Sequence, residues 1–448
     1  MFKRKVYDQL LEWKQISGGK TAILVEGARR IGKSTVVEEF AKNEYEDYIL
    51  IDFSISNNDI IDNFDNINDL DTFFRNLFLY AEKNLTPRKS LIIFDEVQFF
   101  PRARQAIKHL VKDGRYDYIE TGSLISIYKN VKDILIPSEE ESIKMYPMDF
   151  EEFLWANNNF VYADAIRESF EKKQPLGDSI NNTIMKTFRT YMAVGGMPQA
   201  VEAYVNGLDY LSIDRIKQSI LKLYFNDLNK FDEEENGKAR SVLKSLPSAL
   251  SNHNSVFKLS NINKKARTRD YKSTFDFLDE SMIVNMCYNI TSPEVTMELY
   301  SDKNKFKIFM GDTGLLVSLI LNVEKENANT LYKALILDNL SINRGSIFEN
   351  MVAQMLKANN HQLYFHEFKY TPKGTTTEKK YEMDFLLVKG RRIAPIEVKS
   401  SNFRSHKSFD YFKDKYKLKL PEKYIIYTKD FKYEDNIYYI PIYMTMCL

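Results

Sequence analysis

Residues 21–35 read "TAILVEGARRIGKST" and give the clearest indication of a fold in the chain. This stretch opens with a short apolar run, residues 21–27, which predicts a buried β-strand, and residues 33–42 then have helical character. Between them "GARRIGKST" matches the pattern G-x4-G-K-[ST], which predicts a phosphate-binding loop when a strand precedes it and a helix follows it. The sequence therefore predicts a strand–loop–helix unit that binds nucleoside phosphates.

The residues of this loop have distinct expected roles. Glycines let the backbone curl so that its N–H groups face a phosphate, and the N-terminus of the following helix adds partial positive charge. We expect Lys33 to reach the β- and γ-phosphates and the Ser34 hydroxyl to bind Mg²⁺. The expected nucleotide-binding residues are Gly27, Ala28, Arg29, Arg30, Ile31, Gly32, Lys33, Ser34 and Thr35.

A second motif, "LIIFDE" at residues 91–96, supplies the carboxylates that a nucleotide site needs. Four apolar residues precede Asp95 and Glu96, which places both acids at the carboxyl end of a predicted strand, where ligands bind in open α/β sheets. We expect Asp95 to hold Mg²⁺, directly or through water, and Glu96 to orient or deprotonate the attacking water. The next predicted strand ends in Thr121 and Ser123, whose hydroxyls are candidates for sensing the γ-phosphate.

Each motif has a plain alternative, a simple turn for the loop and a simple strand end for the acids. Both motifs together, each in its expected context, indicate a site for ATP with Mg²⁺. Whether the bound ATP is hydrolysed depends on Glu96. The alternative is that Glu96 belongs to a slow nucleotide switch. No arginine finger is assignable, because Arg29 and Arg30 lie in the loop and Arg102 and Arg104 are better explained as surface or structural arginines.

The order of the predicted elements indicates an α/β fold. Apolar strand candidates alternate with helical segments, which predicts a parallel sheet with helices on both faces. The next part of the chain has a helical pattern. It is followed by two predicted helices and two predicted strands, which is the order of a winged helix, and the last part has the pattern of an α/β domain. The expected domains are an AAA-type P-loop ATPase core at 1–150, a helical lid or linker at 151–250, a winged-helix-like segment at 251–330, and a C-terminal domain at 335–448.

Composition narrows the class of protein. The chain of 448 residues has only two cysteines, Cys287 and Cys447, which argues against a disulfide scaffold and against a cysteine-based zinc site. No segment approaches about 18 consecutive apolar residues, and the N-terminus has no long apolar region. We therefore expect a cytoplasmic protein with no membrane partner.

The charge distribution permits a nucleic-acid partner without requiring one. The net charge is +1, but residues 341–448 contain 19 lysines and arginines against 12 aspartates and glutamates. A basic cluster, "KKARTR" at residues 264–269, lies in the winged-helix-like segment, where a solvated helix face is the alternative explanation.

Five motifs in this order, "GARRIGKST", "LIIFDEVQ", "TGS", "YPMDFEEF" and "YMAVGGMPQAV", resemble a prokaryotic family of AAA-type P-loop ATPases. The family is related to STAND and archaeal-type ATPases, and its members are fused to a nuclease-like domain; the resemblance covers essentially the whole chain. It implies an AAA-like core, a helical and winged-helix middle, and a restriction-endonuclease-like C-terminus. AAA relatives often form rings and STAND-like relatives can stay monomeric until activated, so an oligomer is possible.

One segment of this chain departs from the family pattern, and one of the motifs has a structural explanation. The family usually has a Gly-Arg pair before the "PMDF" motif, whereas this chain has Glu139, Glu140 and Glu141 there. The "GGMP" motif has a structural explanation as a tight interhelical turn, in which Gly195-Gly196 supply positive φ and Pro198 begins a helix.

The C-terminal domain contains "EMDFLLVKGRRIAPIEVKS", residues 382–400, which predicts a β-hairpin. With the turn at Gly390-Arg391, Val388 pairs with Ile393 and Asp384 lies opposite Glu397 on the same face. Opposed like charges are destabilising, and a divalent cation is an economical compensation. We therefore expect these two carboxylates to share Mg²⁺ or Mn²⁺.

Two further residues complete the predicted cation site. Glu349, on an upstream helix, is a candidate third carboxylate, and Lys399 projects from the same strand face as Glu397. This is the arrangement of PD-(D/E)XK nucleases, which the resemblance also implies, and such a site would use one or two metal ions. The alternatives are a plain cross-strand ion pair between Glu382 and Lys399, and a domain that binds nucleic acid without cutting it.

The sequence therefore leaves two functions open. In the first, ATP hydrolysis controls a nuclease-like domain that acts on nucleic acid. In the second, the chain is a STAND-like ATP switch whose C-terminal domain recognises a partner and is catalytically silent.

Overall fold

A computed structural model describes residues 1–56, 58–123, 137–235, 237–251, 256–262, 264, 266–322, 327–340, 344–400 and 407–448. The chain divides into two compact units. Unit 1 comprises Met1–Tyr146 with Glu280–Met282, and unit 2 comprises Pro147–Asp279 with Ile283–Leu448.

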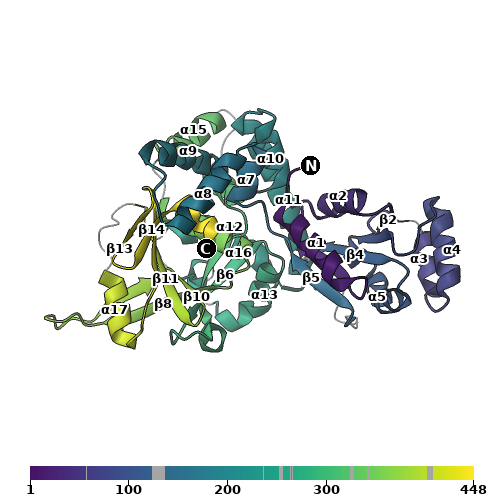
Figure 1. Ribbon diagram of the computed structural model, residues 1–448. Coiled ribbons are helices and arrows are strands. Elements are labelled where there is room, and N and C mark those ends of the chain that lie inside the picture. The colour runs from purple at the N-terminus through teal and green to yellow at the C-terminus, as the bar shows by residue number, and fades with distance from the viewer. Residues whose placement is uncertain are drawn as a thin grey trace. The chain divides into compact units, whose positions relative to one another are not determined.

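Unit 1 is built on a five-stranded sheet in the order β2-β3-β4-β1-β5, and every pair of neighbouring strands in it is parallel (Figure 1). This confirms the expected parallel sheet. The strands are β1 (Ala22–Gly27), β2 (Asp47–Asp52), β3 (Ser90–Asp95), β4 (Asp117–Ser123) and β5 (Glu140–Lys144). The helices are α1 (Lys5–Ser17), α2 (Lys33–Glu44), α3 (Asn58–Asp62), α4 (Leu70–Ala81) and α5 (Pro101–Asp113).

Alternation along the strands divides the apolar side chains of unit 1 between the two faces of the sheet. One face packs against α4 and α5 in a single core cluster that includes Leu24, Ile92 and Phe94. The following residue in each strand points to the other face, and α2 packs against β1, β2, β3 and β4. Helix α1 joins this layer through the edge-to-face contact of Tyr7 with Phe40.

Strand β5 was not predicted from the sequence. It reads "EESIK", and most of its side chains are exposed or half-buried, because it lies at the edge of the sheet. An edge strand does not need the apolar run by which a central parallel strand is recognised. The polar composition of this segment therefore hid a strand that pairs with β1 from Ala22↔Glu140 to Glu26↔Lys144.

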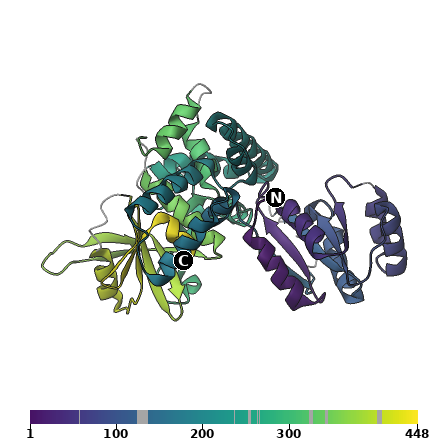
Figure 2. The same ribbon diagram turned by 45° about the horizontal axis from the view of Figure 1, so that its top comes forward.

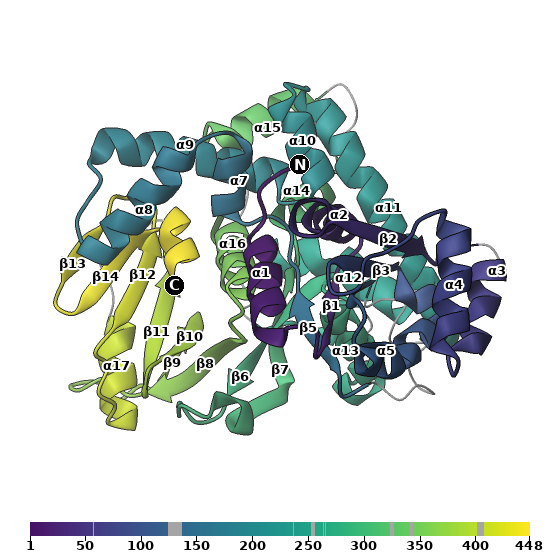
Figure 3. The same ribbon diagram turned by 45° about the vertical axis from the view of Figure 1, so that its right-hand side comes forward.

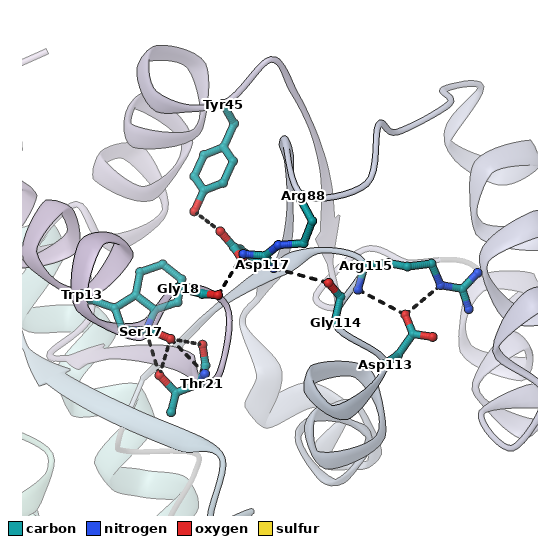
Figure 4. A network of polar contacts seen from close by, with 10 residues as sticks. All are labelled: Trp13, Ser17, Gly18, Thr21, Tyr45, Arg88, Asp113, Gly114, Arg115 and Asp117. Carbon is teal, nitrogen blue, oxygen red and sulfur yellow. Dashed lines mark hydrogen bonds and ion pairs between the residues drawn. The ribbon is translucent and has the colours of Figure 1, made fainter.

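The amino ends of β1 and β4 are joined by a polar network (Figure 4). Arg88 donates to Asp117 Oδ1 at 3.0 Å and to Gly18 O at 3.0 Å, and Tyr45 donates to Asp117 Oδ2 at 2.9 Å. Burial, followed by the charge of Asp117, raises the pKa of Tyr45. This network lies at the amino ends of the strands, whereas the phosphate-binding loop follows the carboxyl end of β1. The network therefore joins segments of the fold at a place away from the loop.

Unit 2 begins with helices, as the sequence predicts for residues 151–250. The "YPMDFEEF" motif forms the start of the first one: Asp149 accepts from Glu152 N at 2.9 Å, and Asp149 N donates to Glu152 Oε2 at 3.2 Å. This reciprocal capping box fixes where the helix begins. The helices are α7 (Phe150–Ala156), α8 (Phe160–Lys172), α9 (Asp178–Val194), α10 (Pro198–Val205), α11 (Tyr210–Glu235), α12 (Lys238–Ser251), α13 (Lys272–Glu280), α14 (Thr313–Leu321), α15 (Ala328–Ile336), α16 (Arg344–Ala358) and α17 (Lys407–Tyr416).

The "GGMP" motif is a tight connection between α9 and α10. Gly195 has φ 88°, and Pro198 begins α10, as expected. Gly196 does not have positive φ, and its requirement for glycine is steric: a Cβ there would lie 2.1 Å from Met148 O. Gly196 N also donates to Asp312 Oδ2 at 2.6 Å. The motif therefore joins the start of α7 to the start of α14.

Two sheets complete unit 2 (Figures 2 and 3). One has the order β7-β6-β8-β9 and the other has the order β10-β11-β12-β14-β13. Helix α16 packs against β6, β7, β8 and β11. The strands are β6 (Val284–Ile290), β7 (Ser301–Met310), β8 (Leu363–Tyr370), β9 (Lys379–Met383), β10 (Phe385–Lys389), β11 (Arg392–Val398), β12 (Lys423–Tyr427), β13 (Lys432–Glu434) and β14 (Ile437–Pro441).

The two strands expected in a winged-helix-like segment are β6 and β7, which pair antiparallel. Strand β6 also pairs in parallel with β8, so strands from residues 284–310 share a sheet with strands from residues 363–383. The division of this region into separate domains stays a prediction. Within the described residues, no helix is both long and apolar enough to cross a membrane.

Candidate functional site

The phosphate-binding loop connects β1 to α2 in unit 1. Gly32 has φ 90° and caps α2, a conformation that a glycine adopts without the steric cost of a Cβ. Lys33 begins the helix and is only 5% exposed, and its Nζ donates to Gly27 O at 3.1 Å and to Ala28 O at 3.0 Å. The loop therefore curls around the ammonium group of its own lysine.

The charge of Lys33 depends on its surroundings. Burial lowers the pKa of Lys33, and the carboxylates of Glu96 and Asp95 partly offset this, which leaves a pKa of about 8. Because that value is above neutral pH, most of the side chain is still charged there. A charged lysine is the form that attracts phosphate oxygens.

Asp95, the last residue of β3, is the centre of the predicted site. Ser34 Oγ donates to Asp95 Oδ1 at 2.7 Å, and Thr121 Oγ1 donates to the same oxygen. Burial raises the pKa of Asp95, and the hydrogen bonds from Thr121 and Ser34 act against this rise. One carboxylate oxygen thus brings together the loop helix, β3 and β4.

Glu96 follows in the left-handed region, with φ 57°, directly before the short 3₁₀ helix Val97–Phe99. Its backbone N donates to Thr121 Oγ1 at 3.2 Å, and its side chain accepts from Gln98 Nε2. Gln98 Oε1 in turn accepts from Ser123 N at 3.2 Å. Glu96 is therefore linked to the end of β4 through both Thr121 and Gln98.

Gln98 and Arg4 are candidate site residues that the sequence analysis missed. Gln98 is part of "LIIFDEVQ", so its place two residues after Glu96 was a usable signal. Arg4 supports the loop from the N-terminus, because it donates to Ile31 O at 2.8 Å and to Tyr146 O at 2.7 Å. It lies in a mixed-charge start that resembles an exposed helix face, and nothing in that pattern marked it.

The acidic segment before the "PMDF" motif has a partner. Arg104 of α5 forms a two-point ion pair with Glu140, at 2.7 Å from Nε and 2.5 Å from Nη2, and both side chains are almost fully buried. Arg102 pairs with Asp65 at 2.6 Å. Both arginines thus have structural partners within unit 1.

The predicted C-terminal site lies in unit 2, where the hairpin register is confirmed. Val388 pairs with Ile393, and Phe385 pairs with Ile396. The first strand is not continuous, however, and this part of the prediction was wrong. Asp384 lies at a bend, where the chain leaves β9 and the sheet of β8 and enters β10 and the sheet of β11.

Two of the candidate carboxylates, Asp384 and Glu397, each accept a hydrogen bond from within the chain. Asp384 Oδ2 accepts from Val398 N at 2.7 Å, and Glu397 Oε1 accepts from Ser408 Oγ. Lys399 Nζ lies 2.8 Å from Glu397 Oε2. The alternative pair of Glu382 with Lys399 is not the pairing found, because Glu382 contacts a different lysine.

That lysine is Lys307 of β7, which the sequence analysis did not assign to the site. Its Nζ lies 2.6 Å from Glu382 Oε1 and 3.3 Å from Glu349 Oε2, and its side chain is 4% exposed. Burial acts to lower the pKa of Lys307, but the neighbouring carboxylates, led by Glu349 and Glu382, raise it well above its usual value. Lys307 is therefore a cation held among acids.

Asp384 has a shifted pKa in this environment. Burial is the largest cause and the charge of Glu349 is the next, while Lys307 acts in the opposite direction, and together they raise the pKa of Asp384 to about 7. We call Glu349, Glu382, Asp384 and Glu397 the carboxylate cluster.

The residues present do not fit the metal centre that the nuclease resemblance implies. In the part of the chain that the structure describes, no group of three or more His, Cys, Asp or Glu side chains is arranged to hold a metal ion. The position between Glu349 and Glu382 is taken by an ammonium group, and lysine donates to carboxylates but is no ligand for Mg²⁺ while charged.

The basic cluster "KKARTR" is only partly described, and Lys265 lies outside the described residues. Lys264, Arg267 and Arg269 are exposed, as both a nucleic-acid surface and a solvated face require.

Three family models match separate parts of the chain. Residues 19–154 match the AAA domain, residues 185–327 match the domain of unknown function DUF8612, and residues 344–445 match the domain of unknown function DUF4143. The first match covers the sheet and the loop described above.

One curated relative and two solved structures are similar to this chain. An uncharacterized protein of Haemophilus influenzae is 25% identical over 255 residues, which are 55% of this chain and about half, 54%, of that protein. AMPPCP-bound DnaA of Aquifex aeolicus has a TM-score of 0.27 at 14% identity, over 62% of this chain and 87% of DnaA. Cdc6p of Pyrobaculum aerophilum has a TM-score of 0.26 at 14% identity, over 72% of this chain and 94% of Cdc6p.

The two TM-scores are too low to add to an argument about this chain. The match to the AAA domain, the parallel sheet and the loop agree with one another. Residues 19–154 match the AAA domain and contain a parallel sheet with a P-loop sequence, and this supports ATP binding and hydrolysis by unit 1.

Proposed function

We propose that unit 1 hydrolyses ATP with Mg²⁺ at the predicted loop, and that its nucleotide state controls a C-terminal nuclease-like domain that binds nucleic acid without cutting it. The observation that carries the proposal is the convergence on Asp95. Ser34 and Thr121, from two different segments, both donate to Asp95 Oδ1, and Glu96 N donates to Thr121 Oγ1.

The loop supplies the binding energy for the phosphates. Backbone N–H groups at the start of α2 point towards an incoming phosphate, and Lys33 is already buried beside the loop carbonyls. On binding, Lys33 exchanges these carbonyl acceptors for β- and γ-phosphate oxygens. Its carbonyl contacts keep the ammonium group within reach of that position.

Ser34 and Asp95 fit a Mg²⁺ site, because they offer a hydroxyl and a carboxylate oxygen only 2.7 Å apart at the loop. When bound with ATP, Mg²⁺ neutralises phosphate charge. Asp95 and Ser34 orient towards the same point, and Thr121 holds the carboxylate in place from β4.

Glu96 acts as the base or as the residue that orients water. Its backbone conformation turns the side chain away from the strand direction, and Gln98 holds the carboxylate. Because Gln98 also contacts the backbone of Ser123, movement at the end of β4 changes the position of Glu96. This provides a physical route by which the nucleotide state reaches the rest of the domain.

The charge of the C-terminal domain and the contents of its carboxylate cluster support the second half of the proposal. Residues 341–448 have a surplus of lysine and arginine, which favours a polyanion as partner. The carboxylate cluster is occupied by Lys307, which favours a silent domain. A metal-dependent nuclease is the second candidate, because Glu349, Asp384, Glu397 and Lys399 do influence one another electrostatically.

Replacing Glu96 with glutamine tests the catalytic proposal. Glu96→Gln keeps the size of the side chain but removes the base, so we expect kcat for ATP hydrolysis to fall about 10²- to 10⁴-fold while ATP affinity changes little. Steady-state phosphate release and equilibrium ATP binding measure the two quantities. Glu12→Gln, an exposed change on α1, is the control, and equal hydrolysis rates for Glu96→Gln and wild type would remove Glu96 from the mechanism.

Gln98 is expected to act on catalysis through Glu96. Gln98→Ala removes a hydrogen bond to a charged group, so kcat should fall about 10-fold or more without a matching loss of ATP affinity. Gln98→Glu, which has the same length but lacks the amide donor, should behave in the same way. Gln105→Ala on the exposed side of α5 is the matched control, and a normal kcat in Gln98→Ala would show that Glu96 needs no such support.

Incubation with plasmid DNA or RNA separates the two candidates for the C-terminal domain. We expect wild type to retard nucleic acid in a gel but to leave it uncut with Mg²⁺ or Mn²⁺, with or without ATP. Metal-dependent cutting that disappears in Asp384→Asn would favour the nuclease instead.

A further inference from the structure

The strongest unassigned feature is the lysine inside the carboxylate cluster. Lys307 comes from β7, Glu349 from α16 and Glu382 from β9, so three separate elements meet at one ammonium group. The lysine is 4% exposed, whereas Glu382 is 18% exposed and Glu349 is 30% exposed. The ammonium group is therefore more deeply buried than the two acids that it contacts.

We propose that Lys307 is the resident cation of the carboxylate cluster, and that it takes the place of a divalent metal ion there. The proposal concerns metal binding, and it deepens the part of the proposed function that treats the C-terminal domain as catalytically silent. The acids are not arranged as a metal site while Lys307 holds Glu349 and Glu382. Removal of Lys307 leaves the acids with unbalanced negative charge, and they then rearrange around a divalent cation.

Charge and geometry support this assignment. A buried cation requires close acids, because a lone ammonium group in a protein interior is strongly unfavourable. Lys307 meets this requirement with two carboxylate oxygens, at 2.6 and 3.3 Å. A Mg²⁺ or Mn²⁺ ion needs the same oxygens at shorter distances, and it would be repelled by the ammonium charge beside them.

The remaining acids of the cluster also have groups of the chain beside them, although Glu397 Oε2 is ion-paired without a hydrogen bond of good geometry. Lys399 is paired with Glu397, and Val398 N donates to Asp384. A metal ion would therefore have to displace two lysines and a backbone donor. Removal of Lys307 changes this balance most, since Glu349 and Glu382 would then lack the cation between them.

The same strand offers a matched control. Lys305 lies two residues before Lys307 in β7 and pairs with Glu367, which also contacts Lys380. Lys305→Met removes the same charge from the same strand but leaves the cluster unchanged. Any effect of lost positive charge in general will appear in both variants.

The experiment measures binding of Mn²⁺ alone to the full chain, without nucleotide, by the loss of the free-ion signal in electron paramagnetic resonance. Wild type and Lys305→Met should show no Mn²⁺ binding that depends on Asp384. Lys307→Met should bind one Mn²⁺, and Lys307→Met with Asp384→Asn should lose it. At about 100 times the dissociation constant, Mn²⁺ should raise the melting temperature of Lys307→Met by about 5–10 °C.

If Lys307→Met does not fold, Lys307→Met with Glu382→Gln keeps the net charge of the cluster and retains Glu349, Asp384 and Glu397, and it should also bind Mn²⁺. Binding of Mn²⁺ by wild type that is lost in Asp384→Asn would overturn the proposal, as would a folded Lys307 variant that binds none. Metal binding by wild type without cutting of nucleic acid would refute this inference alone. A loss of ATP hydrolysis has no bearing on it.

Discussion

The N-terminal unit depends on one carboxylate oxygen, Asp95 Oδ1, which accepts hydrogen bonds from Ser34 and Thr121. These residues belong to α2, β3 and β4, which the chain connects only through long segments. A buried carboxylate is costly unless donors surround it, so the fold and the candidate site stabilise each other. The same contact places Glu96 and Gln98, because both are tied to the end of β4.

Much of this unit was predictable from the sequence because its signals are local. The apolar run and the glycine-containing loop adjoin each other within residues 21–35, and the acid pair directly follows its own apolar run at residues 91–94. Each of these signals has a known chemical role. Strand β5 was missed because an edge strand need not be apolar, and Arg4 was missed because its partners, Ile31 and Tyr146, are distant in sequence. Gln98 stood beside the predicted acids, but its function appears only when Ser123 is seen next to it.

The C-terminal unit shows where sequence patterns are insufficient. Alternation along the hairpin gave the correct register of Val388 with Ile393, but not the bend at Asp384 that passes the chain between two sheets. A motif of acids and one lysine predicts a metal site. The prediction differs from the structure because the local pattern does not include the charge that a distant strand adds. Lys307 adds that charge from β7, and a buried ion pair then stands where a metal ion was expected.

We propose that Asp95 holds the metal of the nucleotide site, and calorimetric titration with ATP measures its contribution to metal-dependent binding. Wild type should bind ATP more tightly in Mg²⁺ than in EDTA. Asp95→Asn should lose about 10-fold or more of that gain, because the carboxylate charge is gone, while its affinity in EDTA stays close to that of wild type. A folded Asp95→Asn variant that keeps the full Mg²⁺-dependent gain would show that Asp95 does not hold the metal.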